Sequence, residues 1–256
     1  MSEVSYKPII SDMIWSYSRL SSFDECPHKW FMRYIKRYKD MPLFYAEYGK
    51  FIHELIESFY NGIIPKNKLS IEFLINFSSR VKGVRPNASI VKKYLDLGKK
   101  YFDEFIEFPY ETVSVEEEFN FEIRGIPFVG FIDYIGKEND EYIIIDNKSR
   151  DLLPRSNRKK PTKKDKELDD MLRQLYVYSA AVKQKYGKFP KYLCFNCFKN
   201  GMLIKEQFDI QKYYEVEDWV EETVRRIEDA EDFDAKPEFF KCKYLCGVSD
   251  YCDYKD

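Results

Sequence analysis

The sequence predicts an α/β fold in which helices surround a mixed central β-sheet. The first observation is the order of the elements, which reads as helices, three strands, a helix, two strands and a helix. The second is a change of pattern near residue 111, where helical spacing of apolar residues gives way to strand-like runs. The third is composition, because 256 residues that are 44% hydrophobic and 18% aromatic are ample for a packed core.

The N-terminal part is expected to be helical. Ser21 or Ser22 can cap a first helix through residues 23–38, in which Trp30, Phe31 and Tyr34 share one face. Apolar residues at helical spacing predict three further helices. Their expected ranges are 46–60, about 70–80 and, after Pro86, 87–108.

Strand patterns begin at Glu111. Three strands are predicted at 111–123, 126–136 and 141–149, joined by turns at 124–125 and 137–140. A loop rich in Lys and Arg follows at 150–167, and then a helix that ends at Gly187. The remaining expected elements are strands at 191–198 and 202–210 around an Asn-Gly turn, a helix at 213–231, and an irregular tail with three cysteines.

Overall properties exclude several classes of protein. The formal net charge of −2 rules out a chain that is basic throughout, so any nucleic-acid-binding surface must be local. The N-terminus lacks the pattern of a signal peptide, and no apolar run approaches the roughly 18 residues of a membrane span. We therefore expect a soluble, cytoplasmic protein without a membrane partner. Six cysteines in a reducing compartment are then metal ligands or buried thiols more readily than disulfides.

The stretch "EYIIIDNKSR" combines a buried-strand pattern with charges at its end. Asp146 and Lys148, two residues apart on a strand, project from the same face. Pairing about the 137–140 turn would bring Asp133 near Asp146, and two such carboxylates repel each other unless a cation neutralises them. A hard divalent ion with an adjacent lysine is typical of a phosphodiester hydrolase. The alternative is a solvated salt bridge at a strand end.

Two helical pairs add to this site. His53 lies four residues before Glu57 on one helix face, and imidazole can join carboxylates on Mn²⁺ or a similar ion. Gln174 and Tyr178 are likewise one turn apart. Taken alone, a single helical histidine is more often structural, and a polar pair on a half-buried helix carries little meaning.

The ordered set of motifs resembles the PD-(D/E)XK nucleases. The motifs are G-x-x-x-H (Gly49 to His53), G-x-x-D (Gly130 to Asp133), "IIDNK" and Q-x-x-x-Y. The resemblance is closest to the RecB/AddB-type exonuclease group, which includes the small CRISPR-adaptation nucleases, and it spans nearly the whole chain. The departures are Ile132 in place of proline before the first Asp, and Asp in place of Glu in the second motif.

This resemblance implies a restriction-endonuclease-like core and a role for each motif residue. His53, Asp133, Asp146 and the Asn147 carbonyl would bind Mg²⁺ or Mn²⁺. Lys148 would act on the attacking water, while Gln174 and Tyr178 would support the site or the DNA strand. The chain would form a single nuclease domain over residues 1–256, with a helical part at 1–110, the nuclease core at 111–230, and a cysteine-rich tail at 231–256 that closes on Cys26.

Four cysteines form a second candidate centre. Cys242, Cys246 and Cys252 fall within eleven residues, and with the distant Cys26 they could hold Zn²⁺ or a [4Fe–4S] cluster, or be incidental buried thiols. Many members of the resembled group have this layout and bind a [4Fe–4S] cluster, which favours iron–sulfur over zinc. The spacing here is C-x₃-C-x₅-C rather than the usual C-x₂-C-x₅-C.

Two further features concern cysteine packing and DNA. Cys194 and Cys197 point to opposite faces of a strand and are expected to pack in the core. The basic loop follows the D-x-K motif directly, where a phosphate backbone must pass, although a charge run is often only a solvated loop. The residues expected to bind nucleic acid are Arg150, Arg155, Arg158, Lys159, Lys160, Lys163 and Lys164.

Together these observations predict a metal-dependent DNA nuclease, specifically an exonuclease that acts on single strands or DNA ends. Its setting would be recombination, repair, phage DNA metabolism or CRISPR adaptation, with a helicase, recombination or CRISPR protein as a possible partner. No G-x-x-x-x-G-K-[ST] motif is present, so the chain lacks that helicase motor signature. The alternatives are a catalytically inactive nuclease-like module that binds DNA or a protein, and a zinc-stapled binding protein.

Overall fold

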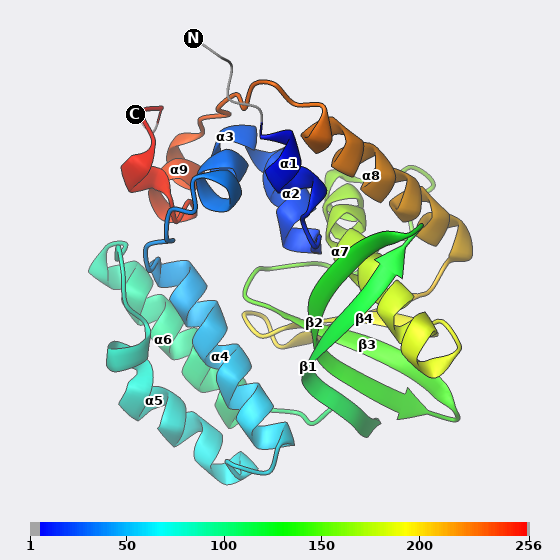
Figure 1. Cartoon of the computed structure of the whole chain (residues 1–256). Helices are drawn as coiled ribbons and strands as arrows, with labels where there is room; N and C mark the ends of the chain where they lie inside the picture. The colour runs from blue at the N-terminus through cyan, green and yellow to red at the C-terminus, as the bar shows by residue number, and fades with distance from the viewer. Residues whose placement is uncertain (1–5, 255–256) are drawn as a thin grey trace.

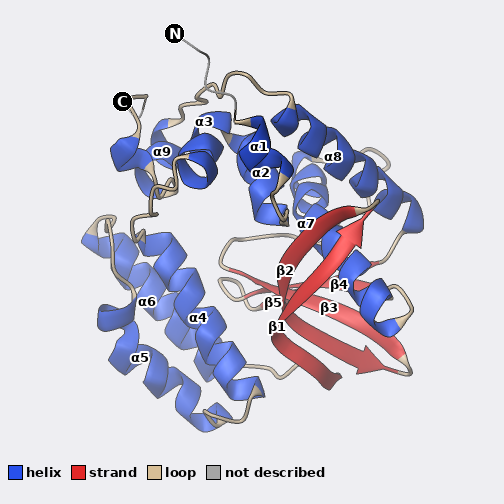
Figure 2. Ribbon diagram, in the orientation of Figure 1, coloured by secondary structure: helices blue, strands red, loops and turns tan. Residues whose placement is uncertain are grey.

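The computed structural model describes residues 6–254. These residues fold around one five-stranded sheet (Figures 1 and 2). The strands lie in the order β1–β2–β3–β4–β5, and neighbours are antiparallel except for the parallel pair β3–β4. The predicted mixed sheet flanked by helices is therefore confirmed. The strand bounds are β1 Glu111–Ile123, β2 Ile126–Glu138, β3 Glu141–Lys148, β4 Tyr192–Cys197 and β5 Met202–Gln207.

Helix α7 (Lys163–Tyr186) connects the parallel strands and covers one face of the sheet. Its apolar residues, such as Leu172 and Leu175, join Ile144 and Phe195 of the sheet in the largest hydrophobic cluster. Helix α8 (Ile210–Glu228) packs against the outer side of α7. This face of the sheet is therefore buried under α7.

Three helices form a second apolar cluster beside the sheet (Figure 2). They are α4 (Phe44–Tyr60), α5 (Leu69–Arg80) and α6 (Ala88–Asp103), and they begin and end within five residues of the predicted bounds. Tyr60 joins this group to the sheet, because its ring lies 4.9 Å from that of Tyr134 on β2. Helix α4 thus runs along the sheet with one side facing it.

The first predicted helix was wrong in detail. A short helix α1 (Lys7–Ser11) is followed by α2 (Tyr17–Glu25), which is capped by Ser16 rather than by Ser21 or Ser22. The helical run breaks at Cys26, whose extended backbone precedes Pro27, because proline disfavours a helical conformation in the residue before it. Helix α3 (Pro27–Trp30) and a π-helical turn (Phe31–Ile35) follow.

The largest other differences from the sequence prediction concern α7 and the tail, while the ends of β2, β5 and α8 shift by two or three residues. Helix α7 begins five residues earlier than expected, because Thr162 and Asp165 form a capping box. Lys163 and Lys164 therefore lie in its first turn and not in a loop. The tail is also more ordered than predicted, with α9 (Phe239–Tyr244) and a 3₁₀ turn (Ser249–Tyr251). Gly187 caps α7 in the left-handed conformation, with φ 83°, as predicted.

Candidate functional site

The β2–β3 hairpin brings Asp133 and Asp146 together. Tyr134 pairs with Ile145, so the next residues along the two strands, Asp133 and Asp146, face each other. Asp133 Oδ2 accepts a hydrogen bond of 2.7 Å from the Asn147 backbone N–H. The neighbourhood expected from the sequence is therefore present.

Glu116 is a third carboxylate of this site, and the sequence analysis missed it. The β1–β2 ladder pairs Val115 with Tyr134 and Glu117 with Ile132, which leaves Glu116 opposite Asp133. Glu116 has a φ of 46°, in the left-handed region that non-glycine residues rarely adopt. Strain of this kind persists where the surrounding structure enforces it, and it gathers at functional sites.

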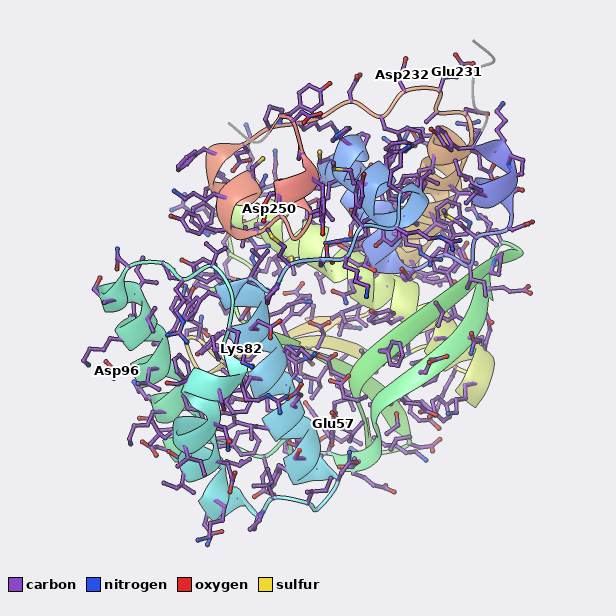
Figure 3. All side chains as sticks on the ribbon, turned by 60° about the vertical axis from the view of Figure 1, so that its left-hand side comes forward. Glu57, Lys82, Asp96, Glu231, Asp232 and Asp250 are labelled. Atoms are coloured by element: carbon purple, nitrogen blue, oxygen red, sulfur yellow. The ribbon has the colours of Figure 1, made fainter. Side chains whose placement is uncertain are left out.

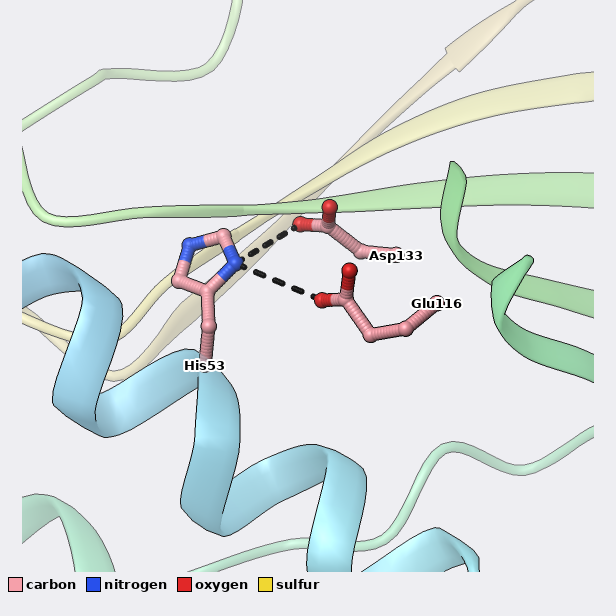
Figure 4. A group of neighbouring side chains, drawn as sticks. All are labelled: His53, Glu116 and Asp133. Atoms are coloured by element: carbon pink, nitrogen blue, oxygen red, sulfur yellow. Dashed lines mark ion pairs between the residues drawn. The ribbon is translucent and has the colours of Figure 1, made fainter. Parts of the chain in front are cut away.

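His53 reaches this cluster from α4 (Figure 4). Its Nδ1 lies 3.3 Å from Asp133 Oδ2 and 3.7 Å from Glu116 Oε1. Its Nε2 lies 2.9 Å from the carbonyl oxygen of Asn147. His53, Glu116 and Asp133 each offer a ligand atom within 4.8 Å of the others, which is the arrangement of a metal site.

The electrostatics of the cluster call for positive charge. Burial opposes a charge on His53, but the carboxylates of Asp133 and Glu116 raise its pKa to about 9. Burial and the neighbouring Asp146 raise the pKa of Asp133. The cluster without a cation thus draws a proton onto the imidazole and favours the neutral form of one carboxylate.

Asp146 supplies a direct test of whether a cation fits. It is buried, and its Oδ2 lies 2.6 Å from Lys148 Nζ, in an ion pair. A buried carboxylate with one lysine as its charge partner, beside an imidazole and two more carboxylates, fits a hard divalent cation. The residues present therefore fit the metal that the motif pattern implies.

A chain of hydrogen bonds holds Lys148 in place. Its Nζ donates to Gln174 Oε1 at 2.8 Å, and Gln174 Nε2 donates to Tyr178 Oη at 3.1 Å. Gly130 gives this chain room, because a Cβ there would lie 2.8 Å from the Tyr178 ring. The Gly, Lys, Gln and Tyr of the motifs are thus parts of one contact chain.

Asn196 on β4 positions Asn147, and the sequence analysis also missed it. Its amide lies 2.7 Å from both Asn147 Oδ1 and Tyr101 Oη. The parallel pairing of Asn147 with Asn196 places these side chains on the same sheet face. This contact holds the end of β3, whose carbonyl faces His53.

The cluster opens to a cavity of about 460 Å³ between α4 and the strand ends. Its lining includes His53, Glu57, Glu116 and Ser149. Figure 3 shows Glu57 on the side of α4 that faces the sheet, so it shares the helix face of His53 as the sequence predicts. A ligand in this cavity would reach the acidic cluster from solvent.

The basic residues after the D-x-K motif fall into two groups. Arg155 is half-buried and held by Asp169 at 2.7 Å and Glu206 at 2.8 Å. It anchors the loop, so we leave it out of a phosphate-binding surface. Arg150 and Lys164 are exposed and each pairs with Glu167. Exposed residues also include Arg158, Lys159, Lys160 and Lys163.

The four tail-associated cysteines line one cavity of about 360 Å³. Cys26, Cys242, Cys246 and Cys252 are all free and half-buried there. Backbone N–H groups of Lys29 and Lys236 point at Cys26 Sγ, at 3.5 and 3.4 Å. Cys194 and Cys197 are fully buried in different hydrophobic clusters, which confirms their expected core packing.

Comparisons with known proteins give a family and a fold. The family model of the PD-(D/E)XK nuclease superfamily matches residues 14–253. A crystal structure from Eubacterium rectale, named as a putative exonuclease, matches with a TM-score of 0.57 and 14% identity, over 98% of this chain and 92% of that one. A structure named SSO0001 aligns with a TM-score of 0.34 and 15% identity over 93% and 86%.

A search of curated proteins finds no match. No helix within residues 6–254 has the length and apolarity needed to cross a bilayer. The family match covers nearly the whole chain and includes every motif residue of the acidic cluster. The chain therefore belongs to the PD-(D/E)XK nuclease superfamily.

Proposed function

We propose that the protein is a metal-dependent deoxyribonuclease, and specifically an exonuclease that acts on single-stranded DNA or DNA ends. The observation that carries this proposal is the convergence of His53, Glu116 and Asp133 beside the buried Asp146–Lys148 ion pair. The residues that would hold Mg²⁺ or Mn²⁺ are His53, Glu116, Asp133, Asp146 and the Asn147 carbonyl. A bound divalent cation would polarise the phosphate and make a bound water more acidic.

The chain's own residues would do the rest. Lys148 Nζ, beside Asp146 and held by Gln174, orients the attacking water and stabilises the negative charge that develops as the water loses its proton. Tyr178 fixes the Gln174 amide, and so the direction of the lysine. Asn147 presents its carbonyl because Asn196 holds its side chain.

The exposed basic residues near α7 would hold the phosphate backbone. Arg150, Arg158, Lys159, Lys160, Lys163 and Lys164 lie close to the D-x-K strand end in sequence, and Lys163 begins the helix that carries Gln174. Positive charge together with a helix N-terminus attracts phosphate. The proposed pathways are recombination, repair, phage DNA metabolism and CRISPR adaptation. We propose that the protein acts in the cytoplasm, with a helicase or CRISPR protein as its partner.

We further propose that the cysteine cavity holds a [4Fe–4S] cluster that staples the two ends of the chain. The support is the shared cavity of Cys26, Cys242, Cys246 and Cys252. Backbone N–H groups directed at cysteine sulfur are a further feature of such sites. Zinc is the alternative that metal analysis after anaerobic purification would detect.

The test is digestion of end-labelled DNA, both single- and double-stranded and both linear and circular, with Mg²⁺ or Mn²⁺. An exonuclease shortens linear DNA from a labelled end and leaves circles intact. Cleavage of circles would make the protein an endonuclease. DNA binding without metal-dependent cleavage in any arm would contradict the catalytic proposal and leave an inactive nuclease-like module.

A further inference from the structure

An aromatic cluster lies between the N-terminal end of α4 and helix α9. It consists of Tyr45, Tyr94, Phe240 and Tyr244. The Tyr45 ring centroid is 5.3 Å from Tyr94, 6.3 Å from Phe240 and 6.5 Å from Tyr244. Figure 1 shows α9 above the start of α4, so the cluster joins segments that are far apart in the chain.

The α9 side of this cluster is open to solvent. Phe240 is 49% exposed and the adjacent Phe239 is 72% exposed. Within residues 6–254, neither belongs to any of the three hydrophobic clusters that form the core. Two adjacent open rings that continue into Tyr45 and Tyr244 form a contiguous apolar patch, which is the kind of surface that binds a ligand or partner.

Lysines accompany the aromatic cluster. Lys243 Nζ lies 5.2 Å from the Phe239 ring centroid and 5.5 Å from that of Tyr244. Lys199 Nζ lies 5.7 Å from the Tyr94 centroid. It is also paired with Asp151 at 2.8 Å, so Lys243 is the lysine best placed to meet a phosphate. Rings interleaved with positive charge match the chemistry of a single nucleic-acid strand, whose bases stack while its phosphates need cations. A purely apolar partner would gain nothing from the lysines.

The cluster is continuous with the proposed catalytic cavity. Tyr45 lines that cavity together with Gly49 and His53, and the three residues follow at four-residue spacing on one face of α4. At about 1.5 Å per residue, Tyr45 lies roughly 12 Å along the helix from His53. That length corresponds to about three or four nucleotides at the roughly 3.4 Å spacing of a stacked strand.

We propose that the aromatic cluster is a stacking platform for unpaired bases, placed three or four nucleotides from the scissile phosphate. This inference rests on the proposed nuclease function and deepens it, because it makes single-stranded DNA the substrate class. Paired bases present their faces to each other and cannot stack on the rings. A duplex end would have to fray by several base pairs to use the platform.

The test measures binding of a fluorescent oligothymidylate of about 12 nucleotides by anisotropy, in EDTA so that no cleavage occurs. Phe240→Leu and Tyr45→Leu keep apolar bulk but remove the ring face. Each should weaken binding by about 5- to 150-fold, the range expected for losing one base–aromatic stack. Phe240→Tyr and Tyr45→Phe keep a ring and should bind within about twofold of the wild type.

A matched control is Tyr214→Leu on α8, because Tyr214 is also 49% exposed but lies outside the cluster. Its affinity should equal that of the wild type. Iron content, measured in each variant, reports whether α9 keeps its place, since Cys242 lies on that helix. The Leu substitutions should weaken binding of a blunt duplex of equal length much less than they weaken binding of the single strand.

Wild-type affinity in the Leu variants, or equal losses for strand and duplex, would overturn the platform. So would a wild-type dimer that Phe240→Leu converts to a monomer in sedimentation, because the occupant would then be a second copy. DNA cleavage by the wild type, measured separately, judges the proposed function. If the wild type cleaves DNA and the Leu variants bind it normally, only the platform is contradicted. If the Leu variants lose binding but the wild type does not cleave DNA, only the catalytic proposal is contradicted.

Discussion

The acidic cluster and the cysteine cavity both gather residues from distant parts of the chain, but different kinds of structure hold them. In the acidic cluster, Glu116, Asp133 and Asp146 lie on three consecutive strands whose backbones are paired on either side of the site. The pairing register of the three strands brings the carboxylates together, and His53 is the member of the cluster that lies on a helix. The backbone is therefore set whether or not a cation is bound.

The cysteine cavity has little regular structure around it. Cys26 stands in extended conformation between two short helices, Cys242 lies on the six-residue α9, and Cys252 follows a 3₁₀ turn. Such short helices are marginal in water. The contrast teaches that the acidic cluster is a preorganised site, whereas the cysteine region depends on what its cavity holds. Four predictions test this contrast, from the largest expected effect to the smallest.

Removing Lys148 should separate activity from stability at the acidic cluster. Lys148→Ala deletes the group proposed to direct the attacking water, so the cleavage rate should fall by about 10²- to 10⁴-fold. The strands stay paired but Asp146 loses its ion-pair partner, so the melting temperature should change little only with Mn²⁺ bound to compensate the carboxylate, and it is compared in that state. Initial rates on labelled DNA and thermal unfolding measure the two effects. Lys191→Ala, an exposed lysine at the start of β4, serves as the control. Near-normal cleavage by Lys148→Ala would remove this lysine from the chemistry.

Removing Cys26 should instead couple metal content to stability. Cys26→Ser would lose the proposed fourth ligand, and iron content and melting temperature should fall together, because metal-binding free energy at such a site is folding free energy. Cys194→Ala, in the core, should keep full iron. Iron and acid-labile sulfide per chain are measured beside thermal unfolding. A Cys26→Ser protein with full iron would show that another residue is the ligand.

Replacing Glu116 should act mainly on the metal-bound state. Glu116→Gln keeps the shape but removes one charge from the cluster, so Mn²⁺ should bind about tenfold more weakly. With metal in excess, the stabilisation from binding then falls by about 1.4 kcal/mol. The measurement is the melting temperature across a Mn²⁺ titration, with EDTA as the reference. An unchanged Mn²⁺ response would mean that Glu116 is no ligand, while a large loss in EDTA would make it structural.

Much of this site follows from the sequence, because strand register is local. The predicted turn at 124–125 lets Ile123 pair with Ile126, and seven steps along each strand bring Glu116 opposite Asp133. The same reasoning, applied to the next hairpin, placed Asp133 beside Asp146. This register could have distinguished Glu116 from Glu117 and Glu118, the two glutamates that follow it in the sequence.

Other features required the fold. The helix breaks at Cys26, before Pro27. There the Cys26 sulfur accepts a hydrogen bond from the backbone N–H of Lys236, which is 210 residues away in the chain. Asn196 looks like an ordinary strand residue until the parallel pairing sets it beside Asn147. Arg155 belongs to a basic run by sequence, but two carboxylates from other elements hold it in the structure. Contacts at long sequence separation carry this information, and local patterns do not contain it.

The smallest predicted effect concerns Asp165, a buried carboxylate of the opposite kind to Asp133. It is 3% exposed and accepts hydrogen bonds from the backbone N–H and hydroxyl groups of Ser156 and Thr162. These donors hold its pKa well below the usual range, whereas crowding raises the pKa of Asp133. Asp165 thus clamps the basic loop to the start of α7 without any cation.

Asp165→Asn should lower stability at neutral pH, because an amide has one acceptor oxygen and directs an NH₂ at donors. The depressed pKa means that the carboxylate contributes fully above the unfolded value of about 3.9 and loses this contribution as pH falls toward the folded pKa. The stability gap between wild type and variant should therefore be constant from pH 7 to about 5 and shrink below about 4. Urea unfolding across that range measures it. A modest loss of DNA affinity should accompany the loosened loop, with catalysis of bound DNA unchanged. A gap that widens on acidification would mean that the four donors do not favour the ionised form.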